Sequence, residues 1–320
     1  MLDLLLLVAG LILLLKSADL LVSGSVSVAT RLRVSPLVIG LTVVSFGTSL
    51  PEMLVTMMSG LQGNADLAIG NLLGSNIANV LLILGIAAMI RPLPVRDSTV
   101  VSEIPFSLMA AILVGFLANA ALFQDHHELS ISRIDGAILL FFFLLFLLYV
   151  YKMARETVLA DTVRAPLGRA RSATYIALGV AGLYFGGRWT VDGAVELARM
   201  AGVDDALIGL TVLAIGTSLP ELIASAVAAW RNHADMAVGN VVGSNIFNLL
   251  LVLGATATLR PIPIPGGFIE SGLWIDYLVM LFTSFLPWLL MRRTYTVDRK
   301  GGAMLLTCYV GYLVYLIAKA

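Results

Sequence analysis

Residues 40–52 read GLTVVSFGTSLPE, and residues 209–221 read GLTVLAIGTSLPE. The repetition continues downstream, where GNLLGSNIAN at 70–79 is matched by GNVVGSNIFN at 239–248. Both pairs are offset by 169 residues, so the chain of 320 residues is two copies of one unit. Each copy carries one glutamate, Glu52 or Glu221, inside a strongly apolar stretch. A duplicated hydrophobic unit that bears a carboxylate indicates a membrane transporter with a pseudo-symmetric site.

The composition is that of an integral membrane protein. Hydrophobic residues make up 59% of the chain, charged residues make up 12%, and the mean hydropathy is +0.96. Soluble domains have about 45–50% apolar and about 25% charged residues. The net charge of zero offers no basic surface for nucleic acid, and the single cysteine, Cys308, excludes an internal disulfide or a cysteine-rich metal site.

Ten hydrophobic segments suit helices of about 20 residues rather than barrel strands of about 10. They cover residues 3–27, 36–61, 67–90, 100–121, 134–153, 173–198, 206–230, 236–259, 270–291 and 302–319. The predicted class is therefore an all-α integral membrane protein with ten transmembrane helices. We expect a first five-helix repeat over 1–153, a linker over 154–172 and a second five-helix repeat over 173–320.

The distribution of Lys and Arg predicts the orientation of the chain. The joints that follow odd-numbered helices hold 14 of these residues, and the joints on the other side hold 4. Cytoplasmic loops carry the excess of positive charge, so both termini are expected to face outward and the linker to be cytoplasmic. Because each copy has five spans, the second copy enters the membrane from the opposite side. The two copies are thus predicted to form an inverted repeat.

The GTSLPE motif predicts a helix broken in mid-membrane. Glycine loosens a helix, and proline removes a backbone donor and clashes with the carbonyl four residues earlier. Freed backbone carbonyls at that depth must be satisfied by protein or by a water-filled cavity. With the hydroxyls of Thr48, Ser49, Thr217 and Ser218 they would offer oxygen ligands to a hard cation. The alternative is a kinked helix with a purely packing role, which does not explain the glutamate after each proline.

The two glutamates and the GSNIxN motif supply further oxygen ligands. A carboxylate at the bilayer centre costs at least about 3 kcal/mol, so Glu52 and Glu221 need a compensating ligand unless, protonated, they bond neighbouring helices. Ser75 and Asn79 lie four residues apart on one helix face, as do Ser244 and Asn248. Close helix packing could explain the glycines and serines. It explains the asparagines less well, because an amide is costly in lipid.

The pooled donor set suits calcium, which takes about 6–8 oxygens in flexible geometry. Magnesium demands a tight octahedron and fits less well, and the repeated motifs contain no His or Cys for zinc or copper. We expect no cofactor: calcium and sodium would be the transported ions, with the lipid bilayer as the surroundings. Nothing in the sequence implies a nucleic-acid or protein partner.

The paired GTSLPE and GNxxGSNIxN blocks resemble the two alpha-repeats of the cation/calcium exchanger superfamily, in particular prokaryotic sodium/calcium exchangers. The resemblance extends over essentially the whole chain and implies sodium/calcium antiport by alternating access. It assigns ion binding to Glu52 and Glu221. It also assigns ligand roles at Thr48, Ser49, Thr217, Ser218, Ser75, Ser244, Asn79 and Asn248, and a sodium-coordinating backbone carbonyl at Ala214, whose equivalent in the first repeat is Ser45.

The position of Asn248 bears on ion selectivity. Some relatives, including potassium-dependent exchangers, have aspartate there, whereas this chain offers two core carboxylates rather than three. That difference argues against potassium co-transport. The resemblance also implies that the first and sixth helices slide against the core. These helices carry Lys16 and Asp19, and Arg188 and Asp192, in roles that could be gating or structural ion pairing.

Three other functions are considered. A proton/calcium antiporter would use the glutamates as proton carriers. A cation channel would line a filter with them, although here the ligands converge within one chain. A membrane enzyme could bind a catalytic metal with the two carboxylates, but no His nucleophile or base accompanies them in the motifs. The excess of Arg over Lys and the lack of a large central regulatory region favour a prokaryotic inner (plasma) membrane protein.

Overall fold

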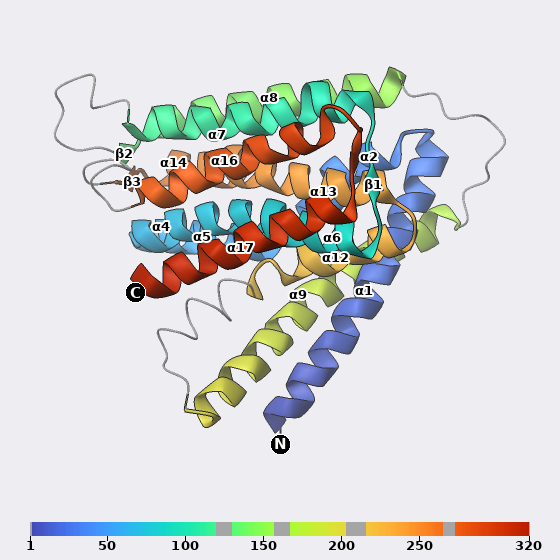
Figure 1. Ribbon diagram of the computed structural model, residues 1–320, viewed down its shortest axis with the longest axis horizontal. Coiled ribbons are helices and arrows are strands. Elements are labelled where there is room, and N and C mark those ends of the chain that lie inside the picture. Colours follow the sequence, from blue (N-terminus) through green and yellow to red (C-terminus); the bar gives the residue numbers. More distant parts are fainter. Residues whose placement is uncertain (1, 120–129, 157–166, 203–215, 265–272, 320) are drawn as a thin grey trace.

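The computed structural model describes residues 2–119, 130–156, 167–202, 216–264 and 273–319. Within these ranges the chain is almost entirely helical. Figure 1 shows a bundle of helices that run roughly side by side, with α1 and α9 leaning away from it as a pair.

The first half of the chain contains five helical segments. Helix α1 (Leu2–Leu32) is followed by a bent segment made of α2 (Pro36–Ile39), the π-helix η1 (Gly40–Val44), α3 (Ser45–Thr48) and α4 (Leu50–Gln62). The third segment comprises α5 (Ala65–Ala78), η2 (Asn79–Leu84) and α6 (Gly85–Ile90). The fourth comprises η3 (Thr99–Glu103) and α7 (Ile104–Asn119), and the fifth is α8 (Arg133–Glu156).

The second half repeats this order over its described residues. Helix α9 spans Arg169–Met200, and α12 spans Leu219–Trp230. The next segment comprises α13 (Ala234–Ile246), η6 (Phe247–Val252) and α14 (Leu253–Leu259). Helices α16 (Trp274–Met291) and α17 (Arg299–Lys319) follow. The predicted segments starting at 206 and 270 lie partly outside the described residues.

The all-helical membrane class is confirmed. Among the described residues, seven helices are long and apolar enough to cross a membrane, and the bent pair Pro36–Thr48 and Leu50–Gln62 counts as an eighth span if taken as one. The helix ends differ from the prediction, since α1 continues to Leu32 and α9 already begins at Arg169. Hydropathy marks where the lipid ends, whereas the ends of a helix depend on residues that interrupt it. Here Pro36 follows the end of α1, and Gly168 precedes the start of α9.

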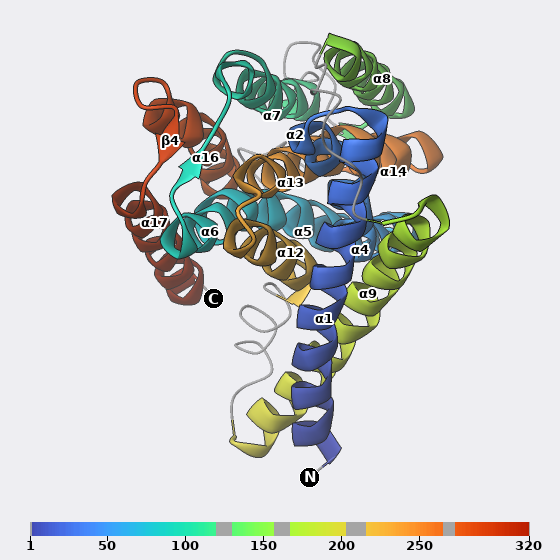
Figure 2. The same ribbon diagram turned by 90° about the vertical axis from the view of Figure 1, so that its right-hand side faces the viewer.

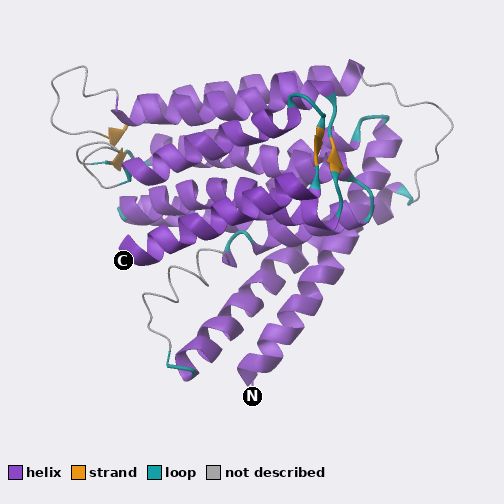
Figure 3. Ribbon diagram, in the orientation of Figure 1, coloured by secondary structure: helices purple, strands orange, loops and turns teal. Residues whose placement is uncertain are grey.

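Two short antiparallel strand pairs join the halves at opposite ends of the bundle (Figure 3). Strand β1 (Leu93–Pro94) pairs with β4 (Thr296–Val297), and β2 (Ser130–Ile131) pairs with β3 (Ile262–Pro263). Each pair connects a joint of the first half to a joint of the second. Prolines suit such two-stranded edges, because they lack a donor for further pairing.

The centre of the bundle is formed by the segments that carry the repeated motifs. The most apolar window of Ala234–Leu259 is 94% buried and that of Ala65–Ile90 is 72% buried, against 28% for α8 and 22% for α17. Viewed along the bundle in Figure 2, α13, α12, α5 and α4 lie inside, with α7, α8, α16 and α17 around them and α1 with α9 on one side. The segments Ala65–Ile90 and Ala234–Leu259, which carry the GSNIxN motifs, are therefore largely covered by the other helices.

Glycines of α13 let the Pro36–Thr48 segment lie directly against its backbone. A Cβ added at Gly243 would be 2.2 Å from Ser45 Oγ and 2.9 Å from the Leu41 Cα. Among the described residues, no heavy atom lies within 4 Å of such a Cβ at the equivalent glycines of the first repeat, Gly70 and Gly74. The predicted close approach is thus found at α13, and the segment equivalent to Leu37–Ser45 that would approach α5 lies outside the described residues.

Replacing Gly243 by valine is expected to destabilise the protein by about 1–3 kcal/mol, because the added atoms overpack a contact made by backbone. The loss would appear as a lower midpoint of thermal unfolding in detergent. Gly311→Val is the matched control, since Gly311 is exposed on α17 with nothing within 4 Å of its Cβ position. Equal midpoints for the two variants would contradict the close packing of α13.

Candidate ion-binding site

The break in the first motif lies at Ser49. Helix α3 ends at Thr48, Ser49 leaves the helical region with φ −79° and ψ 2°, and α4 begins at Leu50 with Pro51 in its first turn. The second part of this span is bent by 52° from the direction of the first. Ser218 has nearly the same backbone, φ −92° and ψ 4°, directly before α12. The broken helix that GTSLPE predicts in the first repeat is confirmed.

Glu52 lies in the first turn of α4 and is 1% exposed. Its Oε1 accepts a hydrogen bond from Ser218 Oγ at 2.6 Å, and its Oε2 accepts one from Asn248 Nδ2 at 2.7 Å. Both donors belong to the second half of the chain. The helix N-terminus and two short hydrogen bonds favour a negative charge at this otherwise buried position.

Glu221 occupies the equivalent position in α12 and is fully buried. Its Oε1 accepts a hydrogen bond from Ser49 Oγ at 2.9 Å. The serine of each motif therefore donates to the glutamate of the other. This crossed pattern brings the two breaks together, and the two carboxyl groups interact electrostatically.

The serines and asparagines of GSNIxN surround the same point. Because the proton of Ser49 goes to Glu221, Ser49 Oγ accepts from Ser244 Oγ at 3.0 Å, and Asn248 Nδ2 lies 3.2 Å from Ser75 Oγ. Asn79 Nδ2 donates to Asn245 Oδ1 at 2.9 Å. All six of these residues are at least 97% buried. The prediction that GSNIxN helices lie beside the breaks is consistent with these contacts.

Four buried oxygens of this group have no hydrogen-bond partner among the described residues: Asn79 Oδ1, Asn248 Oδ1, Glu221 Oε2 and Thr217 Oγ1. A buried acceptor left without a partner costs about 1–3 kcal/mol. The two amide oxygens can only accept hydrogen bonds, and the same is true of Glu221 Oε2 when that glutamate is ionised. Such oxygens, beside two carboxyl groups, fit a dehydrated cation better than any protein donor.

Asn79 is the first residue of the π-helix η2, and Asn248 is the second residue of η6, which begins at Phe247. The wider turn of a π-helix rotates the residues that follow it, and such turns are frequent at functional sites. Both lie at equivalent places in the two repeats. Nothing in the residue pattern predicts them, since the local sequence is ordinary for a helix.

The remaining predicted ligands have different surroundings; they are Thr48, Thr217, Ser45 and Ala214. Thr48 Oγ1 donates to Asn240 Oδ1 at 3.2 Å, whereas Thr217 borders a cavity. Ser45 Oγ is bound in the helix contact with α13, donating to the carbonyls of Gly40 and Asn240 at 2.7 and 3.0 Å. Its hydroxyl therefore does not face the glutamates. Ala214 lies outside the described residues.

Sequence reasoning missed Asn240 and Asn245, which are 1% exposed and bonded within the site. Both belong to the repeated block GNVVGSNIFN, of which only the last asparagine was selected. The signal was available, because the cost of burying an amide in a membrane applies equally to every asparagine of the motif.

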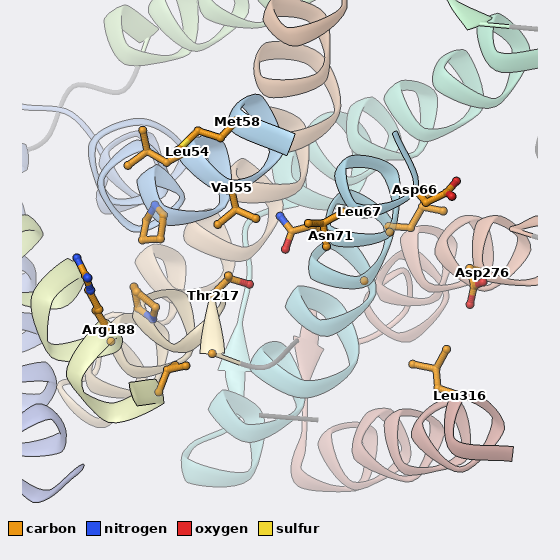
Figure 4. Close-up of a pocket in the computed structure, with 18 of the residues that line it drawn as sticks. Leu54, Val55, Met58, Asp66, Leu67, Asn71, Arg188, Thr217, Asp276 and Leu316 are labelled. Atoms are coloured by element: carbon orange, nitrogen blue, oxygen red, sulfur yellow. The ribbon is translucent and has the colours of Figure 1, made fainter. Parts of the chain in front are cut away.

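A cavity of about 900 Å³ reaches the site from one end of the bundle (Figure 4). Its lining includes Pro51, Thr217 and Pro220 of the two breaks, together with residues near the start of α5 and α16, such as Asp66 and Asp276. Arg188 and Asp192 of α9 line its side and form a 3.7 Å ion pair with each other. The cavity gives ions a path toward Thr217.

The two charged residues predicted on the first helix, Lys16 and Asp19, lie on α1 and differ in their surroundings. Asp19 pairs with Arg231, the residue that follows α12, and Arg231 Nη1 donates to Ser23 Oγ at 2.7 Å. Lys16 is exposed. Helices α1 and α9 themselves pack closely, since a Cβ at Gly186 would lie 2.9 Å from the Leu14 amide.

The donor set is unlike that of a resident transition metal. Within the part of the chain that the structure describes, no group of three or more His, Cys, Asp or Glu side chains is gathered. Two carboxylates with amide and hydroxyl oxygens instead suit hard cations such as calcium and sodium.

A family model described as "Sodium/calcium exchanger protein" matches residues 2–152 and 171–318.

The chain belongs to the sodium/calcium exchanger protein family. It is 36% identical over 322 residues to the "Putative antiporter CaxA" of Alkalimonas amylolytica, with 97% of both chains covered. It is 37% identical over 321 residues to the "Inner membrane protein YrbG" of Escherichia coli, covering 97% of this chain and 94% of the relative. The "Sodium/calcium exchanger MaX1" of Methanosarcina acetivorans is 29% identical, with 98% and 97% covered.

A solved structure of the sodium-calcium exchanger NCX_Mj matches with a TM-score of 0.82 and 30% sequence identity, covering 98% of each chain. The resemblance drawn from the two repeated motifs is thereby confirmed. The protein is a membrane exchanger of the cation/calcium type and not an enzyme.

Proposed function

We propose that this member of the sodium/calcium exchanger protein family exchanges sodium for calcium at one site built from both halves of the chain. The crossed serine–glutamate hydrogen bonds support this most strongly, because they join two carboxyl groups from opposite halves beside unpartnered oxygens. The proposed ligands are Glu52, Glu221, Asn79, Asn248, Thr48, Thr217, Ser49, Ser218, Ser75 and Ser244, with the carbonyls of Ser45 and Ala214.

The charge of the site explains why exchange is obligatory. Two ionised glutamates contribute −2, which one calcium ion or two sodium ions neutralise. A third sodium ion would leave +1 and make transport electrogenic. The site without an ion resists crossing, because moving bare charge through hydrocarbon is costly. With asparagine at both 79 and 248, the site needs no potassium ion.

We further propose two inverted five-helix repeats, 1–153 and 173–320, joined by a cytoplasmic linker over 154–172. In this arrangement both termini face outward, and β1–β4 and β2–β3 close opposite faces of the bundle. The 900 Å³ cavity reaches the face where α17 ends, so the ion site would be approached from outside in this conformation. Similarity to the inner membrane protein YrbG supports a prokaryotic inner membrane.

Proton/calcium antiport is the second candidate. The similarity to the putative antiporter CaxA leaves the driving ion open, and buried glutamates can carry protons. Calcium would use the hydroxyl and amide oxygens around the glutamates in either kind of antiporter, and it is the match to the sodium/calcium exchanger family that favours sodium as the driving ion.

Calcium uptake into vesicles of purified protein distinguishes the two. Vesicles loaded with sodium, potassium or protons are diluted into medium lacking the internal ion, with radioactive calcium outside. We expect rapid uptake from the sodium gradient alone and no effect of added potassium. Uptake driven equally by a proton gradient without sodium would replace the first candidate by the second.

A further inference from the structure

Asn240, the asparagine of GNVVGSN, joins the two halves of the site without being one of the proposed ligands. Its Oδ1 accepts from Thr48 Oγ1 at 3.2 Å, and its Nδ2 donates to Ser225 Oγ at 2.9 Å and to the Glu221 carbonyl at 3.4 Å. The side chain is 1% exposed. The bond to Asn240 is the shorter of the two in which Thr48 Oγ1 can donate, the other being to the Ser45 carbonyl at 3.4 Å. When the hydroxyl proton is directed to Asn240, its lone pairs point elsewhere, so this bond orients Thr48 as an acceptor for a cation.

The equivalent of Asn240 in the first repeat is Asn71, and the equivalent of Ser225 is Thr56. One contact of the set is the same, because Asn71 Nδ2 donates to Thr56 Oγ1 at 3.0 Å. Asn71 is thus held on α5 in the same way as Asn240 is held on α13. It presents its amide oxygen from an equivalent position in the repeat.

The other contact differs between the halves. Thr217 is the equivalent of Thr48, and its buried Oγ1 has no partner among the described residues. Thr217 and Asn71 both line the 900 Å³ cavity, where Figure 4 labels them. Gly239 and Gly243, which flank Asn240, contact the first broken helix, whereas Gly70 and Gly74, which flank Asn71, have none of the described residues within 4 Å of their Cβ positions. One half of the site is closed by an asparagine–threonine bond, and the other half has both partners but not the bond.

We propose that Asn71 and Asn240 are positioning residues of the exchange cycle. Each orients the threonine of the opposite repeat toward the ion, and the Asn71–Thr217 bond forms when the cavity side closes. The Asn240–Thr48 bond is made when its half is closed, and the Asn71–Thr217 bond is made when the other half is closed. One bond therefore breaks and the other forms when access to the site changes sides. This inference rests on the proposed antiport, whose ligands it leaves unchanged.

A double-mutant cycle on calcium uptake tests the bond that this structure does not contain. Asn71→Leu and Thr217→Val each remove one partner, and we expect each to lower kcat/KM for calcium about tenfold. If the two side chains act through one bond, the double variant should also lose about tenfold. Independent roles would give about a hundredfold loss, and that result would overturn the proposal.

The same variants separate positioning from folding. Asn71→Leu should lower kcat with little change in KM, because its bond is made only after the ion has entered. Asn240→Leu should raise KM about tenfold, because its bond is already present. The mixed pair Asn71→Leu with Thr48→Val should be additive and serves as the control cycle. A shared loss of folded protein with unchanged kcat and KM would overturn the proposal.

The Asn71 half carries the test even if Asn240→Leu fails to fold, because Asn71 borders a cavity and Thr217→Val is nearly isosteric. Wild-type vesicles provide the reference in the same assay. Absence of sodium-driven uptake by the wild type would refute the proposed function. Normal wild-type uptake with additive Asn71 and Thr217 variants would refute only this inference.

Discussion

Glu52→Gln and Glu221→Gln are each expected to reduce sodium-driven calcium uptake by about a hundredfold or more. Removing one partner from a buried charge arrangement costs about 3–5 kcal/mol, and each 1.4 kcal/mol is about a tenfold change in binding. Glutamine keeps the size of the side chain and can still accept from Ser218 or Ser49. The measurement is the initial rate of uptake per molecule of protein incorporated in vesicles.

Glu103→Gln is the matched control for a buried glutamate. Glu103 is fully buried in η3 and accepts from Tyr149 of α8 at 2.6 Å, in a contact separate from the two breaks. We expect it to transport calcium at nearly the wild-type rate. Normal transport by both Glu52→Gln and Glu221→Gln would show that these carboxyl groups do not hold the ion.

Asn248→Leu is expected to have the second largest effect, a loss of about tenfold to a hundredfold in kcat/KM for calcium. The substitution removes an unpartnered oxygen and also the amide that donates to Glu52 Oε2 at 2.7 Å. Hydrogen bonds to charged groups contribute about 1.5–3 kcal/mol, which corresponds to that range.

Asn119→Leu controls for the loss of an amide elsewhere in a spanning helix. Asn119 ends α7, and its Nδ2 donates to the Gly115 carbonyl of its own helix at 2.7 Å. We expect little change in kcat/KM. If Asn119→Leu and Asn248→Leu reduce transport equally, the effect of Asn248 is on folding rather than on the ion.

Much of the fold could be predicted because the two strongest signals are simple. Hydropathy locates helices in lipid, and a proline four residues after a glycine breaks one, as at Ser49. The duplication then predicts that Glu52 and Glu221 approach each other, and the crossed serine bonds are consistent with that prediction. Helix ends were less predictable, since α9 extends well beyond its apolar stretch.

What could not be predicted is the difference between the two halves. Asn71 and Asn240 stand in nearly identical sequence, yet only Asn240 is bonded to its threonine. Identical motifs have identical local preferences, so the sequence cannot say in which half this bond is made. Ser45 shows a second limit, because its hydroxyl is bound by the Gly40 carbonyl of its own segment and by the Asn240 carbonyl of the facing helix α13, a contact that depends on tertiary packing.

Calcium titration of the purified protein by calorimetry tests the single shared site most directly. We predict one calcium ion bound per chain, an apparent affinity that falls as sodium is added, and no binding by either Glu52→Gln or Glu221→Gln. Two calcium ions per chain, each lost with only one of the glutamates, or calcium binding that sodium does not weaken, would contradict a site shared by both repeats.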